Sequence, residues 1–258
     1  MRIPIFVRAL LTVTAALFMA VPAHSQAVSG QGTWESTLLG RDINLNPVAA
    51  SDASAVYLYD TTLNVTWLRD ANKNVGNGNG GLMDWNTATT WAANLVTGSG
   101  ATAISDWRLP AMAANPNDGV SYDGSTSRGY NVPTNSSEMA SLFYGTLGNK
   151  AYFDTSGTAQ TGNGLTNAGS FQNMQSIAYW LGTEYAPVTS GAWEFVIATG
   201  FQSASMKNVQ VSAMAVRTGD VLAPVPEPET YAMLLAGLGV LGAVARRRHS
   251  DKALVAQS

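Results

Sequence analysis

The sequence of 258 residues contains no cysteine. Its only histidines are His24 and His249, which lie in terminal segments that we expect to be removed. The remaining domain then has no thiolate and no imidazole, which excludes cysteine nucleophiles, Ser-His-Asp catalysis and metal centres built on these ligands. Disulfides are excluded as well, so a hydrophobic core must hold the domain together. A chain of about 200 residues is long enough to bury such a core.

Positive charge is also scarce. Between Gln26 and Pro226 the chain has eight Lys and Arg against fourteen Asp and Glu, a formal charge of −6. Nucleic-acid binding requires a basic patch that displaces counterions from phosphates, and no such patch is visible. We therefore expect no nucleic-acid partner. A polyanionic glycan would be repelled in the same way, unless a divalent cation bridges the two.

The N-terminus has the three parts of a secretory signal peptide. Arg2 and Arg8 are basic, residues 9–21 are apolar, and Ala23 and Ser25 are small residues before a cut at Gln26. The pattern predicts a signal peptide over residues 1–25, with the Sec translocon and signal peptidase as partners. A retained N-terminal anchor is the alternative, but the apolar run is short for a membrane span.

The C-terminus contains an apolar run, residues 231–245, followed by Arg246, Arg247 and Arg248. The run is shorter than the roughly 20 residues of a standard span, yet it has no polar stripe of the kind that an amphipathic helix shows. It predicts a transmembrane helix. The arginines then form a cytoplasmic membrane stop at the start of a basic tail, residues 246–258, and the domain before Tyr231 faces outwards.

The segment before the apolar run is Val225-Pro-Glu-Pro-Glu-Thr230. This motif, a short span and an arginine cluster resemble the PEP-CTERM sorting signal of Gram-negative bacteria that produce exopolysaccharide. The resemblance implies that an exosortase recognises Pro226, Glu227 and Pro228 in the linker 221–230. The protein would then be an inner-membrane-anchored precursor that is released or attached at the cell surface or in the extracellular matrix. A permanent C-terminal anchor is the alternative.

Hydrophobic periodicity and turn residues predict the elements of the domain itself. Asp84 is a predicted N-cap for a helix that ends at Gly98, and a second helix is predicted to start near Asn135 or Ser136. Residues 111–133 are predicted to form an exposed excursion. The predicted strands are residues 32–40, a hairpin of 56–59 and 63–68, a short strand at 150–154, and 177–181, 192–197 and 209–217.

The loop 69–81 is rich in Gly and Asn. Asp70, Asn72 and Asn74 have the alternating oxygen ligands of a calcium loop. However, Val75 stands where an EF-hand needs Gly, and Gly81 stands where its bidentate Glu belongs. The alternative is a turn in which Asp and Asn side chains cap their own backbone. Calcium is the one cofactor that the sequence suggests.

The segment Asp106-Trp-Arg-Leu-Pro110 places an arginine between apolar residues. A partly buried guanidinium must find a carboxylate, and Glu138 in the second helix is the first candidate. Glu184 and Asp70 are the alternatives. We favour a structural ion pair over a site for an anionic ligand.

These motifs together resemble the bacterial domain family typified by the C-terminal domain of the collagen-like adhesin Lcl. The resemblance covers residues 55–220, and residues 26–54 would be an N-terminal strand and loop extension. It implies an α+β, C-type-lectin-like domain with two helices and several short, mostly antiparallel strands. The motif residues that would form its structural core are Trp67, Asp70, Asp106, Trp107, Arg108, Glu138 and Trp180.

The resemblance to this family predicts the fold better than it predicts any activity. The oxidases of this fold need cysteines and its iron enzymes need histidines, so we expect no enzyme. The hypothesis is a surface or matrix module that associates with exopolysaccharide. The alternatives are a structural envelope or biofilm matrix protein with no discrete ligand, and a glycan hydrolase with a carboxylate pair. The candidate glycan contacts are Tyr122, Tyr130, Glu184, Tyr185 and Trp193.

Overall fold

The computed structural model describes residues 27–113 and 118–222, without the side chain of residue 77. The predicted signal peptide, sorting motif, transmembrane helix and basic tail all lie outside the described residues. Among the residues that are described, no helix is long and apolar enough to cross a membrane.

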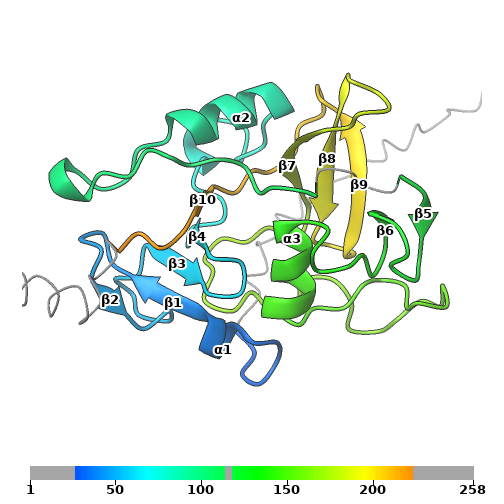
Figure 1. The fold of residues 1–258 in the computed structure, drawn as a ribbon, viewed down its shortest axis with the longest axis horizontal. Helices are drawn as coiled ribbons and strands as arrows, with labels where there is room; N and C mark the ends of the chain where they lie inside the picture. Colours follow the sequence, from blue (N-terminus) through cyan, green and yellow to red (C-terminus); the bar gives the residue numbers. More distant parts are fainter. Residues whose placement is uncertain (1–26, 114–117, 223–258) are drawn as a thin grey trace, which may run out of the picture.

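Five strands form a first sheet in the order β10-β4-β3-β1-β2 (Figure 1). All neighbours in it are antiparallel. The predicted hairpin is confirmed, with Asp60 of β3 opposite Val65 of β4. The strands are β1 (Leu38–Arg41), β2 (Pro47–Val48), β3 (Tyr57–Asp60), β4 (Val65–Leu68) and β10 (Val216–Thr218).

The predicted N-terminal extension is part of this sheet. The prediction of a strand over 32–40 is wrong in its first half, because Trp34–Thr37 forms a short helix, α1, before β1. β1 pairs with β3 along its whole length. Trp34 and Leu38 are buried in the main core. Residues of the predicted extension therefore share a sheet and a core with residues that follow position 55.

A second sheet has the order β5-β6-β9-β8-β7. Its members are antiparallel except for the pair β5 and β6. The predicted strand 209–217 is reduced to β10, and β9 was not predicted. The strands are β5 (Val120–Ser121), β6 (Arg128–Gly129), β7 (Ala178–Glu184), β8 (Gly191–Val196) and β9 (Phe201–Met206).

The two predicted helices are present. Asp84 caps α2 (Trp85–Asn94) by accepting a hydrogen bond from the Thr87 backbone N–H at 2.9 Å, and the helix ends before Gly98. α3 (Glu138–Ala140) starts later than predicted, because Ser137 is its N-cap. It continues as a wider helical turn, η3 (Ser141–Thr146). Single 3-10 turns, η1 (Val75–Asn77) and η2 (Gly100–Thr102), lie in loops.

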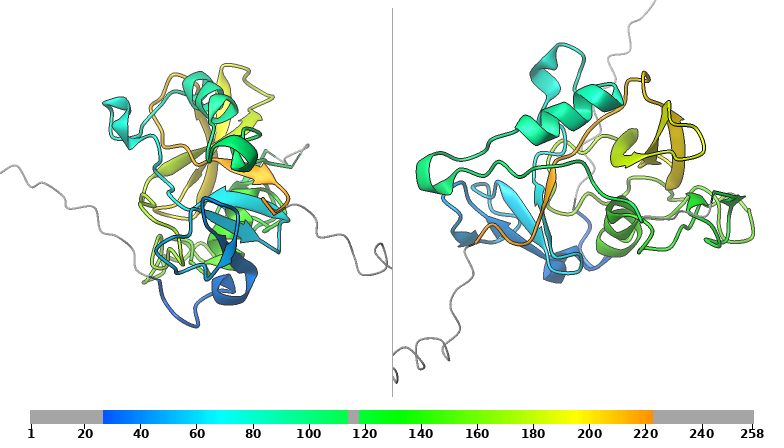
Figure 2. Two further views of the ribbon diagram at one scale, coloured as in Figure 1. Left: turned by 90° about the vertical axis from the view of Figure 1, so that its left-hand side faces the viewer. Right: turned by 45° about the horizontal axis from the view of Figure 1, so that its top comes forward.

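The main core brings the two sheets and the second helix together. Trp67 of β4, Trp193 of β8 and Met139 of α3 are all fully buried in it. In Figure 1 and Figure 2, α3 lies between the blue strands of the first sheet and the yellow strands of the second, and α2 packs against β7. There Ala88 and Ala92 of α2 pack with Trp180 of β7 in a second cluster. The α+β class with antiparallel sheets is confirmed, and the C-type-lectin-like fold stays a prediction.

Candidate functional site

The arginine of the Asp-Trp-Arg-Leu-Pro motif makes the predicted ion pair. Arg108 donates to both carboxylate oxygens of Glu138, each at 2.7 Å, and Glu138 also accepts from the Ala111 backbone N–H at 2.6 Å. The hydrogen bonds that Arg108 donates to Glu138 raise the pKa of Arg108. The structural ion pair is therefore confirmed. Glu184 and Asp70, the alternative partners, have other contacts.

The aspartate of the same motif ties this loop to the last strand. Asp106 accepts from Arg217 at 2.7 and 2.9 Å, and this hydrogen bond lowers the pKa of Asp106. Trp107, which lies between Asp106 and Arg108 in the sequence, is buried. Its ring stacks on that of Tyr57, with the two ring centroids 5.9 Å apart. The motif thus joins α3, β10 and β3.

Trp193 is not a glycan contact, and this part of the prediction is wrong. The side chain is 0% exposed, because it lies on the face of β8 that packs into the main core. Tyr185 meets it edge to face at 5.3 Å and is half-buried. The Tyr185 hydroxyl donates to the Asp118 carboxylate at 2.6 Å, which raises the pKa of Tyr185.

Glu184 is exposed and forms an ion pair with Lys207. The Lys207 ammonium also lies 4.7 Å from the ring centroid of Trp85. These groups therefore bind one another beside the ends of β7 and β9.

The remaining two predicted contacts, Tyr122 and Tyr130, lie together. Their rings stack in parallel with centroids 5.8 Å apart. Phe153 meets both rings edge to face at 5.2 and 5.1 Å, and Tyr152 meets Phe153 at 4.7 Å. We call Tyr122, Tyr130, Tyr152 and Phe153 the aromatic patch. Its outermost rings are Tyr122, 45% exposed, and Tyr152, 41% exposed.

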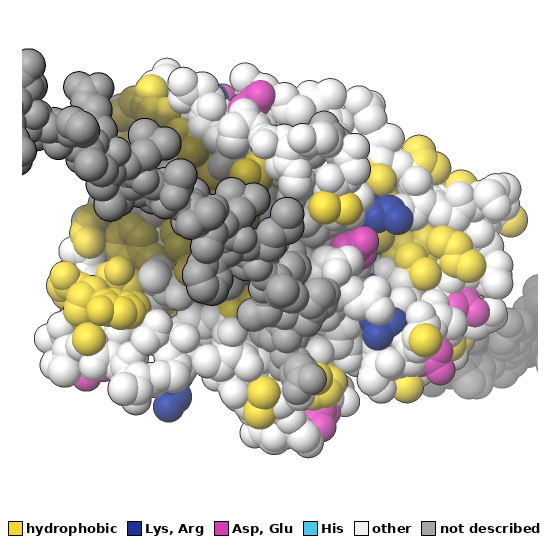
Figure 3. Space-filling model, turned by 180° about the vertical axis from the view of Figure 1, so that it is seen from behind, with side chains coloured by type: hydrophobic (Ala, Val, Ile, Leu, Met, Phe, Trp, Pro, Cys, Tyr) yellow, Lys and Arg dark blue, Asp and Glu magenta, His cyan; other side chains and the backbone are white. Residues whose placement is uncertain are grey.

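Sequence reasoning did not find Tyr152 and Phe153, because residues 150–154 were interpreted as a strand. The structure has no regular strand there, only isolated bridges from Lys150 to Gly164 and from Phe153 to Ala159. Figure 3 shows hydrophobic side chains gathered at the end of the molecule where the loops around β5 and β6 lie. The sequence signal for these two residues was an aromatic pair, Tyr152-Phe153, within a polar, glycine-rich stretch.

Two loops support the patch. The Asn131 side-chain N–H donates to the backbone carbonyls of Tyr122, at 2.7 Å, and Phe153, at 2.9 Å. Gly157 has φ +82° and lies against the Tyr122 ring, where an added Cβ would be 3.5 Å from a ring carbon. Asp154 holds the turn by accepting from the backbone N–H groups of Ser156 and Thr158 at 2.9 Å. The rings are therefore held by a defined backbone.

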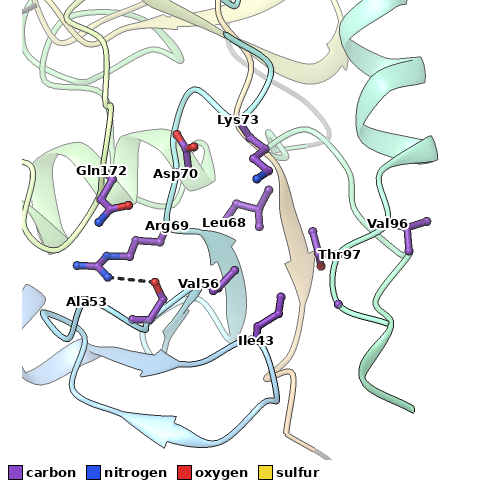
Figure 4. Close-up of a pocket in the computed structure, with 12 residues that line it drawn as sticks. Ile43, Ala53, Val56, Leu68, Arg69, Asp70, Lys73, Val96, Thr97 and Gln172 are labelled. Atoms are coloured by element: carbon purple, nitrogen blue, oxygen red, sulfur yellow. Dashed lines mark hydrogen bonds between the residues drawn. The ribbon is translucent and has the colours of Figure 1, made fainter. Parts of the chain in front are cut away.

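A cavity of about 440 Å³ lies at the other end of the molecule, beside β3 and β4 (Figure 4). Aliphatic side chains line it, including Val56, Leu68 and Val96, and Lys73 and Asp70 lie at its edge. No aromatic side chain is among its lining residues. The cavity therefore offers an aliphatic floor with one cation and one carboxylate, and no ring on which a sugar would stack.

Arg69 also borders this cavity, but its guanidinium is buried and points away from it (Figure 4). It donates to the backbone carbonyls of Ser170 at 2.9 Å and Ala55 at 3.0 Å, and also to that of Asp52. Arg69 is therefore a structural residue that holds three loop segments, and it is not available to a ligand.

The predicted calcium loop contains the capping contacts of the alternative interpretation. Asp70 Oδ1 accepts from the Asn72 backbone N–H at 3.1 Å and from Asn173 at 3.0 Å. Across residues 27–113 and 118–222, no cluster of three or more acidic, His or Cys side chains could hold a metal ion. A calcium site would have to use amide oxygens, and it stays a prediction.

Among the described residues two carboxylates are buried, and burial raises the pKa of both. Asp60 in β3 accepts from the backbone N–H of Thr62, at 2.9 Å. Glu194 in β8 accepts from the Ser205 hydroxyl at 2.7 Å. They belong to different sheets.

The comparisons with known proteins concern the C-terminal end. The family model for the PEP-CTERM protein-sorting motif matches residues 224–248. Neither the curated proteins nor the solved structures give a match. The chain therefore carries the sorting motif of an exosortase substrate, which implies export and a membrane-anchored precursor that exosortase processes.

Proposed function

We propose that the domain is a non-catalytic module that holds the sorted protein in exopolysaccharide, with the aromatic patch as its contact surface. The observation that carries the proposal is the stack of Tyr122 on Tyr130, with Tyr122 and Tyr152 exposed at its edges. Exposed apolar clusters mark interaction surfaces. An organism that sorts proteins through an exosortase supplies the polysaccharide that such a surface would meet.

Tyrosine suits this role because it combines an apolar ring with a polar hydroxyl. The turns beside the rings carry hydroxyl and carboxylate groups, which suit sugar hydroxyls as hydrogen-bond partners. Asp123 and Asp154 are acidic, and hydrogen bonds from Ser125 and Ser156 lower the pKa of these carboxyls, so both stay charged at neutral pH. The patch therefore favours a neutral polysaccharide over an anionic one.

The backbone around the patch is also organised before binding. The Asn131 bridge between the two loops and the turn at Asp154 fix the ring positions. Less conformational entropy is then lost when a chain of sugars binds. This organised backbone supports a binding surface rather than a loop that has no role in binding.

The non-catalytic role rests on the residues that remain after export. With the terminal segments removed, no Cys or His is left, and the two buried carboxylates lie in separate sheets. The second candidate function is a structural matrix protein with no discrete ligand, which the same sorting route would serve.

The test is equilibrium binding of the purified protein to isolated exopolysaccharide. Tyr122→Ala and Tyr152→Ala should each weaken binding by roughly two- to tenfold, the range expected for one aromatic contact. Tyr59→Ala, a half-buried tyrosine on β3, is the matched control and should bind normally. Binding that is equal for all four proteins, or equal across unrelated glycans, would leave the structural matrix protein as the better account.

A further inference from the structure

The loop between Asp70 and Gly81 contains two buried amide oxygens that have no hydrogen-bond partner. They are Asn72 Oδ1 and Asn74 Oδ1, in side chains that are 4% and 7% exposed. A buried acceptor that is left unsatisfied destabilises a protein. Two of them in one short loop therefore call for a ligand that satisfies both.

The orientation of both amides is fixed by their nitrogens. Asn72 Nδ2 donates to the Gly80 carbonyl at 3.3 Å, and Asn74 Nδ2 donates to the Gly81 carbonyl at 2.7 Å. Rotating either amide by half a turn would place its oxygen against a carbonyl oxygen and leave its N–H groups unpaired. The free groups are therefore oxygens.

Asn72 Oδ1 packs against the backbone of Gly81. Gly81 has φ +91°, and a Cβ added there would lie 1.9 Å from Asn72 Oδ1. Any side chain at this position would push the oxygen away, so glycine is required for the observed geometry. The two amides donate to consecutive peptide carbonyls, so the two side chains lie side by side in the same loop.

We propose that this loop binds a calcium ion, with Asn72 Oδ1 and Asn74 Oδ1 as ligands and Asp70 as the source of negative charge. Calcium takes oxygen ligands only and accepts amide carbonyls and water, whereas magnesium prefers a stricter octahedral geometry and dehydrates reluctantly. The loop supplies a single carboxylate. The affinity should therefore lie in the weak range of roughly 10⁻⁴–10⁻³ M that extracellular modules show.

The first experiment is thermal unfolding of the purified protein in EDTA, in about 10 mM magnesium and in about 10 mM calcium. With a dissociation constant in the range above, calcium should raise Tm by roughly 3–10 °C, and magnesium should raise it less. Equal Tm values in EDTA and calcium would overturn the proposal.

A substitution with an opposite effect in the two buffers makes the test sharper. Asn74→Asp adds a charge at the ligand position, so Tm should fall in EDTA and the calcium-dependent rise should be larger than in the parent protein. Asn135→Asp adds the same charge at an exposed position before α3 and should leave the calcium effect unchanged. A calcium effect that changes equally in both variants would mean a nonspecific response to charge and would also contradict the site.

Discussion

The tryptophans of the sheets and the tyrosines of the loops occupy opposite environments. Trp67, Trp180 and Trp193 are fully buried, whereas Tyr122 and Tyr152 are exposed on the two loops of the aromatic patch. The strands that carry these tryptophans, β4, β7 and β8, pack into the hydrophobic clusters, so the tryptophan rings are buried. The loops lie at one end, where only part of each ring is covered. Stability should therefore depend on the first group and binding on the second.

The largest expected effect is the loss of a core tryptophan. Trp193→Ala should lower the free energy of unfolding by about 3–5 kcal/mol, because the removed ring leaves a cavity that the two sheets cannot close. Urea unfolding followed by circular dichroism measures this change. A loss below about 1 kcal/mol would contradict the burial of Trp193.

The next effect separates the two ion pairs of the Asp-Trp-Arg-Leu-Pro motif. Glu138→Ala should lower stability by about 2 kcal/mol, because it leaves the partly buried guanidinium of Arg108 and the Ala111 N–H without their acceptor. Asp106 is mostly exposed, so Asp106→Ala should lower it by less than about 1 kcal/mol. The same denaturation experiment compares both. A larger loss of stability for Asp106→Ala than for Glu138→Ala would contradict this prediction.

A smaller effect should depend on pH. Burial raises the pKa of Glu194 in the folded protein above its ordinary value of 4.5, so the native state binds the proton more tightly than the unfolded chain. This contribution is fully present below that ordinary value and is lost as pH rises through the raised pKa. Glu194→Gln should therefore unfold at a higher Tm than the parent protein near pH 7, and the difference should shrink as pH falls towards 4.5. A difference that is constant with pH would show that Glu194 titrates normally.

The smallest effect on stability should come from the patch. Tyr152→Ala should lower the free energy of unfolding by less than about 1 kcal/mol, since the ring is largely in water and its burial contributes little. The same substitution should change polysaccharide binding more than it changes stability. A strong loss of stability in this variant would mean that the loop is part of the core, and binding experiments with it would then have no clear interpretation.

Several local features could be predicted because neighbouring residues decide them. Asp84 caps α2 as expected, since the N-cap interaction needs only a short polar side chain and the next turn of backbone. The hairpin of β3 and β4 follows from alternating apolar residues and a short turn. The pairing of Arg108 with Glu138 was predicted from the cost of burying an unpaired charge.

The elements that were missed depend on distant partners. β9 carries Ser203 and Ser205 and was not among the predicted strands, but it pairs along its length with β8. Residues 34–37 alternate like a strand and yet form α1, because their apolar contact is Trp34 packing into the core. Trp193 was expected at the surface because the sequence does not tell which face of a strand is covered.

The sequence by itself determined that the chain is exported and sorted, because the PEP-CTERM motif is a linear signal that an enzyme reads. It also determined the absence of Cys and His chemistry from the domain, since that follows from composition alone. Only the tertiary structure decided which aromatic rings are exposed and which are core. It alone brought Tyr122 and Phe153 together and left two amide oxygens of one loop without partners. Burial and pairing arise from contacts between residues far apart in the chain, and a linear pattern does not specify those contacts.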